Sequence, residues 1–255
     1  MRRTIGNMKS TKGKEKITVL TAYDYSAARI IDEAGVDIIL VGDSLGNVVL
    51  GYESTKEVTM EDMLRHTGAV ARGAKDCLIV ADMPYNSDET MGLAVKNAKL
   101  LIKAGAHAVK IEGKPEIAEA LVKENIIVMG HVGLLPQTAE EMKVQGKDEE
   151  SAGNILNDAI ALEKAGCFAI VLECVPEDLA KKITETVKIP TIGIGSGPYC
   201  DGQVLVSNDM LGLFDKTPKF VRKYANLKDE IKKAVEEYCK DVKEGNFPSD
   251  KECFK

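Results

Sequence analysis

The sequence has no long apolar run and no excess of basic residues, two features that mark membrane proteins and nucleic-acid-binding proteins. No apolar stretch approaches the roughly 20 residues that cross a bilayer. The 34 Lys and Arg residues are outnumbered by 40 Asp and Glu residues, which leaves a net charge of −6. This balance argues against the basic surface that a nucleic acid would need. We therefore expect neither a membrane nor a nucleic acid as a partner.

Histidines are few, and the cysteines form no sequence motif. The chain has only 3 histidines, which disfavours a zinc site built from three of them. None of its 6 cysteines belongs to a Cys-x-x-Cys motif, and Cys77 and Cys167 stand where strands are predicted to begin. We expect buried free thiols there rather than disulfides. The basic start, residues 1–4, has no apolar segment behind it, which predicts no secretory signal and a cytoplasmic protein.

What the sequence does contain is a repeated unit. Each copy has an amphipathic helix that ends at a glycine, then an apolar strand, then an acid where the strand ends. The four copies span residues 33–43, 72–82, 103–112 and 164–173. A glycine is expected after a helix because it adopts the left-handed conformation without strain. The strands are apolar on both faces, which is typical of a buried parallel sheet.

Predicted strands and helices alternate along most of the chain. Strands are predicted near 17–21, 38–42, 78–82, 107–111, 126–130, 168–172 and 190–194, with a weaker eighth near 203–206. Helices are predicted near 24–34, 59–73, 89–104, 115–123, 150–165 and 176–187. Such alternation implies right-handed crossovers between parallel strands. The sequence therefore predicts a single-domain (β/α)8 TIM barrel over residues 1–255, with an extra C-terminal helix at 227–244.

Four acids follow predicted strands at equivalent positions: Asp43, Asp82, Glu112 and Glu173. Any one of them, taken alone, is better explained as a turn residue or a helix cap. In a barrel, however, the carboxyl ends of all strands open onto one face, where ligands bind. Four carboxylates at one mouth would repel each other unless a cation lay between them. Oxygen ligands without a cysteine or histidine cluster favour Mg²⁺.

Two further residues and one loop are candidates for the same mouth. Lys110 lies near the end of the fourth strand, and His131 is expected to open a loop after the fifth. We assign a site role to His131, and structural roles to His66 and His107. The glycines at 193–197 follow the seventh strand, where barrels often bind phosphate. Their spacing is not that of a dinucleotide-binding loop.

Six motifs together resemble the ketopantoate hydroxymethyltransferase family. They occupy residues 42–46, 81–84, 110–113, 130–137, 172–176 and 200–206, in order within a resemblance that covers 21–224. Each motif is modestly specific, but six in sequence are a strong signal. The chain departs from the family pattern at Tyr85, Leu135 and Ser196, where phenylalanine, threonine and alanine are common. These three differences affect what can be inferred about folate binding, and they do not affect the inferred reaction.

The resemblance implies an enzyme of pantothenate biosynthesis. It would transfer a one-carbon unit from 5,10-methylenetetrahydrofolate to 3-methyl-2-oxobutanoate, giving 2-dehydropantoate. The resemblance assigns Mg²⁺ to Asp43, Asp82 and Glu112, and it places the keto acid against Asp43, Ser44, Asp82 and Lys110. It also makes Glu173 the proton acceptor. Family members are homo-oligomers, commonly decamers, so the C-terminal helix is expected to pack between subunits.

The residue types fit this chemistry independently of the family. A carbon beside a ketone is a weak acid, so its deprotonation needs an electron sink such as Mg²⁺ bound to the oxygens of a 2-oxo acid. A carboxylate can then remove the proton, and Glu173 is our choice of base. Lys110 can balance the charge of the substrate. His131 is a candidate proton relay or a contact of the product hydroxyl.

Two other functions stay open at this stage. A 2-oxo-acid lyase or a phosphoenolpyruvate-mutase-like enzyme would use the same fold, acids and metal. The chain lacks the cysteine loop of the KKCGH type that such lyases use, which favours the transferase. A non-catalytic barrel that binds a phosphate ligand would explain the glycines at 193–197 but not the four acids.

Overall fold

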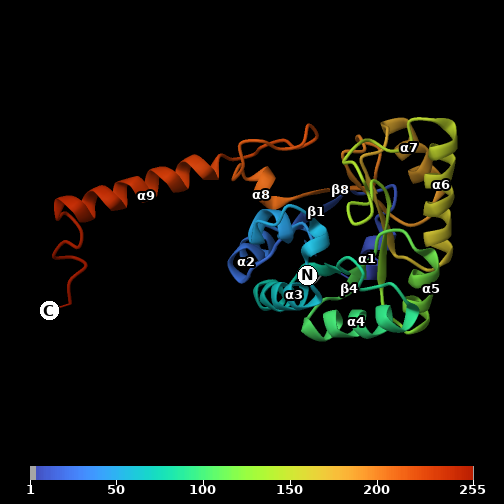
Figure 1. Ribbon diagram of the computed structural model, residues 1–255, viewed down its shortest axis with the longest axis horizontal. Coiled ribbons are helices and arrows are strands. Elements are labelled where there is room, and N and C mark those ends of the chain that lie inside the picture. Colours follow the sequence, from blue (N-terminus) through green and yellow to red (C-terminus); the bar gives the residue numbers. More distant parts are fainter. Residues whose placement is uncertain (1–3, 255) are drawn as a thin grey trace. The chain divides into compact units, whose positions relative to one another are not determined.

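The computed structural model of the protein describes residues 4–254 and contains a closed barrel of eight parallel strands in chain order (Figure 1). The strands are β1 (Ile17–Thr21), β2 (Ile38–Val41), β3 (Leu78–Asp82), β4 (Ala108–Lys110), β5 (Val128–Gly133), β6 (Ala169–Glu173), β7 (Thr191–Ile194) and β8 (Gly202–Leu205). The predicted TIM barrel is confirmed, including the weak eighth strand. Residues 1–3, on which the expectation about a secretory signal partly rests, lie outside the described range.

Helices connect most consecutive strands, as predicted. They are α2 (Tyr25–Glu33), α3 (Met60–Gly73), α4 (Met91–Ala104), α5 (Pro115–Lys123), α6 (Glu149–Lys164) and α7 (Glu177–Thr186). Side-chain caps begin several of them: Thr59 and Asp62 form a reciprocal capping box at α3, and Asp148 accepts from the Ser151 amide at α6. Two short helical segments, η1 (Gly46–Leu50) and η2 (Thr55–Glu57), follow β2 and were not predicted.

Alternation along the strands divides the core into two layers. One apolar cluster fills the inside of the barrel and includes Val19, Leu40, Val80 and Val171. The other lies between strands and helices and includes neighbours such as Ile79 and Ile170. Successive side chains of a strand point to opposite faces, so one strand supplies both layers.

A short helix, which was not predicted from the sequence, covers the amino-terminal end of the barrel. Helix α1 (Ile5–Ser10) places Met8, which is 1% exposed, in the inner cluster with Ile17 and Phe168. Phe168 precedes β6 and Ile17 begins β1, so this helix lies at the amino-terminal ends of the strands. It gives a structural role to part of the segment 1–14, for which the sequence suggested none.

Three of the four glycines in the repeated unit adopt the predicted left-handed conformation. Gly35, Gly105 and Gly166 have φ values of 83°, 118° and 99°. Gly73 differs: it is still the last residue of α3 and does not have a positive φ, so its place in the repeat has another reason. A Cβ atom there would lie 2.4 Å from the Tyr25 carbonyl oxygen, so only glycine permits the close packing of α3 against α2.

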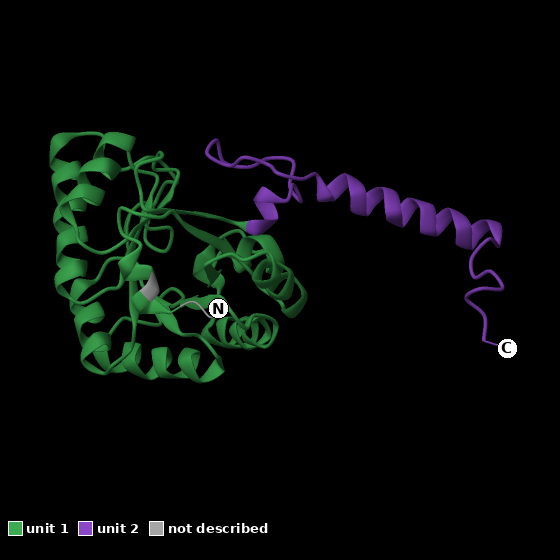
Figure 2. Ribbon diagram, turned by 180° about the vertical axis from the view of Figure 1, so that it is seen from behind, with its two compact units in different colours: residues 1–206 green, residues 207–255 purple. Residues whose placement is uncertain are grey.

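The chain divides into two compact units, Met1–Val206 and Ser207–Lys255 (Figure 2). The first holds the barrel. The second contains α8 (Ser207–Met210) and α9 (Leu227–Glu244), which confirms the helix predicted at 227–244. That residues 1–255 form one domain stays a prediction.

All six cysteines are free, and Cys77 and Cys167 are buried as expected. Within residues 4–254, no helix is both long enough and apolar enough to span a membrane.

Candidate active site

The inward-facing positions of four strands change from apolar to polar at the carboxyl end of the barrel. Val80 in β3 faces the interior, and Asp82, two residues later, ends that strand. The same spacing relates the interior residues of β4, β5 and β6 to polar residues further along: Ala108 to Lys110, Met129 to His131, and Val171 to Glu173. Because side chains alternate, these polar groups form the top inward layer of the barrel. The predicted convergence is thereby confirmed for these strand ends.

Asp43 and Asp82 are both buried and adjoin each other at this mouth. The Asp43 amide donates to Oδ2 of Asp82 at 3.1 Å. The other oxygen of Asp82, Oδ1, lies 2.9 Å from Nζ of Lys110. Asp82 and Lys110 are register partners on β3 and β4, so strand pairing itself holds this ion pair together. Both side chains are nearly inaccessible, at 4% and 6% exposure.

Glu112 joins the cluster from the segment that follows β4. Its Oε2 accepts the backbone N–H of Gln137 at 3.1 Å, and its Oε1 lies 3.7 Å from Nδ1 of His131. Gln137 also reaches Asp43, whose Oδ2 accepts from its Nε2 at 2.8 Å. Gln137 is the last residue of the motif at residues 130–137, and no role was predicted for it. No local pattern marks it, because its partners are distant in sequence.

His131 lies inside strand β5, which corrects the expectation that it opens a loop. β5 runs to Gly133 and pairs with β6 over five positions, among them His131 with Val171 and Gly133 with Glu173. This pairing brings Nε2 of His131 to 3.2 Å from Oε2 of Glu173. The His131 side chain is 1% exposed and that of Glu173 is 19% exposed, so Glu173 is the member of the pair that a ligand can reach.

The backbone directly after Glu173 is strained. Cys174 has a φ of 48°, in the left-handed region that residues other than glycine rarely adopt. Its amide and carbonyl are fixed by hydrogen bonds to the Ile194 carbonyl and from the Gln145 amide. Strain of this kind persists only where the surroundings enforce it, and it is frequent at functional sites.

Burial and mutual repulsion shift the protonation of the cluster. Burial, and then the charge of Asp82, raise the pKa of Asp43 to about 7. Burial raises the pKa of Glu112 to about 8, with Asp43 adding to the effect and Lys110 opposing it. Burial alone would lower the pKa of Lys110, but the neighbouring acids, Asp82 first, raise it. Burial lowers the pKa of His131, which favours its neutral form.

The donor set fits a hard divalent cation in its chemistry. Three buried carboxylates, Asp43, Asp82 and Glu112, face one buried lysine, and burial first, with repulsion between the acids adding to it, raises the pKa of Asp43 and Glu112. Carboxylate oxygens are the preferred ligands of Mg²⁺. Among residues 4–254, however, no three acid, histidine or cysteine side chains are already arranged as a metal cage. The carboxylates would have to turn to ligate an ion.

The other predicted residues have clear positions. Ser44 follows Asp43, and its hydroxyl lies 2.9 Å from the Tyr23 hydroxyl, a neighbour that sequence reasoning missed. His66 and His107 contact backbone groups of Tyr23 and Ile79, in keeping with their structural reading.

The glycine loop at 193–197 is occupied by protein groups rather than shaped for an anion. The Ser196 hydroxyl donates to the Leu172 carbonyl at 2.7 Å. A Cβ atom on Gly197 would lie 2.6 Å from the Cβ of Glu177, so an acidic residue packs against this loop. A carboxylate in that place disfavours phosphate.

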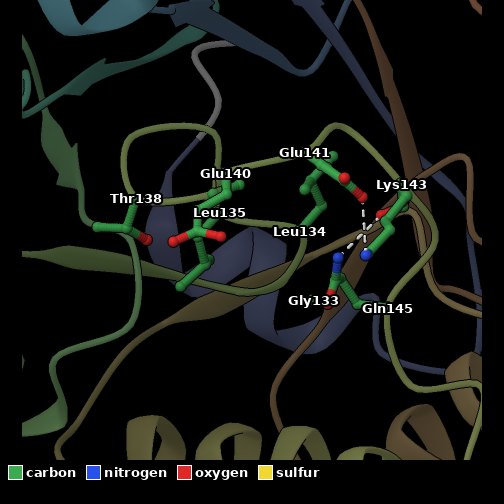
Figure 3. A pocket seen from close by; sticks show the side chains of 9 residues that line it. Gly133, Leu134, Leu135, Thr138, Glu140, Glu141, Lys143 and Gln145 are labelled. Atoms are coloured by element: carbon green, nitrogen blue, oxygen red, sulfur yellow. Dashed lines mark hydrogen bonds and ion pairs between the residues drawn. The ribbon is translucent and has the colours of Figure 1, made fainter.

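A cavity of about 390 Å³ lies in the loop between β5 and α6, within residues 133–145 (Figure 3). Leu134 and Leu135 line one part of it, and Thr138 and Glu140 line another. Two backbone hydrogen bonds tie this loop to the candidate base: the Leu134 amide donates to the Glu173 carbonyl at 2.9 Å, and the Gln145 amide donates to Cys174 at 2.8 Å. The cavity is therefore attached to the same strand end as Glu173.

Solved structures share the barrel fold at low sequence identity. Phosphonopyruvate hydrolase superposes with a TM-score of 0.66 at 14% identity, covering 99% of this chain and 93% of that one. 2,3-Dimethylmalate lyase gives a TM-score of 0.62 at 15% identity, covering 100% and 93%. Likeness at this level speaks for the fold alone.

Sequence comparison identifies the family. The family model described as ketopantoate hydroxymethyltransferase matches residues 2–250. Proteins named 3-methyl-2-oxobutanoate hydroxymethyltransferase are similar over nearly the full chain. The one from Clostridium kluyveri is 58% identical, covering 94% of this chain and 89% of its own, and one from Clostridium botulinum is 55% identical, covering 100% and 96%. The resemblance read from the six motifs is thereby confirmed, and the protein is a transferase of the ketopantoate hydroxymethyltransferase family.

Proposed function

We propose that the protein transfers a hydroxymethyl group to 3-methyl-2-oxobutanoate, with 5,10-methylenetetrahydrofolate as donor, and so makes 2-dehydropantoate for pantothenate synthesis. The acceptor is the compound in the printed names of its relatives. The observation that carries the proposal is the pairing of a partly exposed carboxylate, Glu173, with a buried neutral imidazole, His131, beside the buried acids. A C–C bond forms between C3 of the keto acid and the donated carbon, and water supplies the hydroxyl oxygen. Both bonds from that carbon to the two folate nitrogens break, and the C3 proton and one proton of water end on these nitrogens.

Glu173 is the proposed base. Its Oε2 is within reach of a ligand at the mouth, and removal of the C3 proton converts the keto acid into a carbon nucleophile. Nε2 of the neutral His131 lies 3.2 Å from the same oxygen without a hydrogen bond of good geometry, and a small turn of either side chain would let it donate and orient the carboxylate toward the substrate. His131 is then a positioning residue in the first step, and its role as a relay toward the product hydroxyl is a further part of the proposal.

Asp43, Asp82 and Glu112 are the proposed holders of Mg²⁺. When bound there, Mg²⁺ would act as a Lewis acid on the ketone of the substrate. Lys110 is held at this place by Asp82, 2.9 Å away, and its permanent charge can face the substrate carboxylate. Asp43 and Asp82 would border the keto acid, and Ser44 would donate its hydroxyl to it.

The cavity at residues 133–145 is the proposed position of the folate donor. It adjoins the backbone of Glu173, so a ligand there lies at the edge of the acid cluster. Its wall combines the apolar Leu134 and Leu135 with the polar Thr138 and Glu140, and a pterin ring has apolar faces and a polar edge. Leu135 is also one of the positions where the chain departs from the family pattern.

A homo-oligomer, a decamer by the family resemblance, is also part of the proposal. Helix α9 carries Ile231, Val235, Tyr238 and Val242 at intervals of three and four residues, and each is between 45% and 57% exposed. A helix with an uncovered apolar stripe gains stability when it packs against a partner. A second copy of the chain is the proposed partner. The cytoplasmic location stays a prediction.

One assay tests the function directly. The purified protein is mixed with 3-methyl-2-oxobutanoate, methylenetetrahydrofolate and Mg²⁺, and 2-dehydropantoate is measured by mass spectrometry. Leaving out each component in turn tests the donor and the metal separately. Exchange of the C3 hydrogen of the keto acid with deuterated water, followed without folate, tests enolisation by itself. Cleavage of the keto acid instead of product formation would favour the lyase alternative.

A further inference from the structure

Gln137 is a neutral, buried side chain that contacts two of the proposed metal acids at once. It is 4% exposed. Its Nε2 donates to Oδ2 of Asp43 at 2.8 Å and to the Met83 carbonyl at 2.9 Å. Its backbone N–H donates to Oε2 of Glu112 at 3.1 Å. One residue therefore uses all three of its N–H groups inside the acid cluster.

The contacts of Gln137 cross the mouth of the barrel. Asp43 follows β2, Met83 follows β3 and Glu112 follows β4, whereas Gln137 belongs to the loop after β5. Asp43 and Gln137 are 94 positions apart in sequence. Pairing of β2 with β3 and of β3 with β4 already holds the backbones of Asp43 and Glu112 near each other. Gln137 comes from a different segment and holds one side-chain oxygen of each of these acids.

The division of donors among the acids has a chemical consequence. Asp82 is paired with the cation Lys110, whereas Asp43 and Glu112 receive hydrogen bonds from a neutral amide and a backbone N–H. A second lysine at this place would balance their charge and compete with a metal ion. A neutral donor fixes one oxygen of each carboxylate and leaves its negative charge available.

We propose that Gln137 is a positioning residue for the metal: by holding one oxygen of Asp43 and one of Glu112, it restricts how these carboxylates turn, so that their other oxygens can meet a common divalent ion. The inference rests on the proposed function, since it assumes that these acids hold the ion. Hydrogen bonds behind metal ligands set the orientation of the ligands and contribute strongly to affinity. Gln137 touches the ligands rather than the reacting atoms, so its loss acts on turnover through the metal.

The test measures metal binding, separately from turnover, in the variant Gln137→Met and in a control variant. Methionine has a similar length and volume but no N–H group, and the variant keeps the backbone bond to Glu112. The control is Gln203→Met, which removes an exposed amide that donates to the Gly197 carbonyl. The dissociation constant for Mn²⁺ is measured by electron spin resonance of the free ion, and the unfolding temperature is measured without metal. Gln137→Asn serves as a second variant, because it keeps an amide but is one methylene too short to reach Asp43.

The expected result is a rise of about 10- to 100-fold in the Mn²⁺ dissociation constant for both Gln137 variants. The control should bind as the unchanged protein does. Turnover of Gln137→Met should recover as the Mn²⁺ concentration is raised, which a defect in folding or in substrate packing would not do. A folded Gln137 variant that binds Mn²⁺ within twofold of the unchanged protein overturns the inference. If the unchanged protein binds no Mn²⁺, the proposed metal site itself fails, a result distinct from failure of the Gln137 inference alone.

Discussion

Nε2 of His131 and Oε2 of Glu173 lie 3.2 Å apart on the adjacent strands β5 and β6. The imidazole is enclosed and the carboxylate is partly open, so a buried group supports one that a ligand can reach. Because burial lowers the pKa of His131, the ring is neutral near physiological pH and can donate one N–H. This arrangement suits a carboxylate base held in one orientation.

Replacing the proposed base should stop the chemistry and leave binding intact. Glu173→Gln keeps the shape of the side chain but cannot accept the C3 proton, so kcat should fall roughly 10²- to 10⁴-fold. The KM for the keto acid should change little. Steady-state kinetics measure both, and Glu119→Gln, which breaks an exposed ion pair on α5, is the control. Normal turnover in Glu173→Gln would remove this residue as the base.

Loss of Asp82 should weaken the binding of both the metal and the keto acid. Asp82→Asn removes one proposed ligand and leaves Lys110 without its partner 2.9 Å away, so the Mg²⁺ concentration for half-maximal activity should rise more than about 10-fold. The matched control is Asp88→Asn, which changes another buried acid paired with a lysine, Lys114, that the site does not include. An unchanged Mg²⁺ dependence in Asp82→Asn would contradict the ligand assignment.

Metal affinity should depend on pH in the range set by the two shifted acids. The pKa of Asp43 is raised to about 7 and that of Glu112 to about 8, so both are increasingly protonated as the pH falls through this range. Protons then compete with the ion, because only the carboxylate form is a ligand. Mn²⁺ affinity should rise from pH 6 through pH 8 and level off near pH 9, about one unit above the higher pKa. Binding titrations at steps of one pH unit measure this. An affinity that is flat between these values would contradict the burial-driven shifts.

Filling the cavity in the loop after β5 should weaken the binding of the folate donor and leave that of the keto acid unchanged. Thr138→Trp places a large ring in the 390 Å³ space, so the KM for methylenetetrahydrofolate should rise about 10-fold or more while that for the keto acid stays within about twofold. Thr186→Trp, on an exposed position of α7, is the control for a surface tryptophan. Equal rises in both KM values would indicate a distorted site instead of a blocked donor pocket.

A charge on the apolar stripe of α9 should weaken assembly. Val235→Glu combined with Tyr238→Glu places two carboxylates where the proposed interface is apolar, so light scattering should report a smaller particle. Lys240→Glu changes the charge of α9 at an exposed polar position and should leave the mass unchanged. If the double variant keeps the mass of the unchanged protein, α9 does not hold the subunits together.

Much of this protein follows from short-range features of its sequence. Buried strands are recognisable as apolar runs, helices as amphipathic periods, and their ends as glycines, so the barrel and the residues at its mouth were predictable. Asp82, Lys110 and Glu173 could be assigned to that mouth because the carboxyl ends of parallel strands meet there. Even the bounds of α9, 227–244, agree with the prediction.

Only the tertiary structure decided which of these groups touch. The extension of β5 through His131 depends on pairing with β6, a partner about 40 positions away, and the 3.2 Å approach to Glu173 follows from that register. Gln137 meets Asp43 across 94 positions. Met8, near the start of the chain, packs against Phe168 in the core of the barrel. Such contacts carry no periodic signal in the sequence, because they arise from closure of the barrel, which brings distant strand ends together.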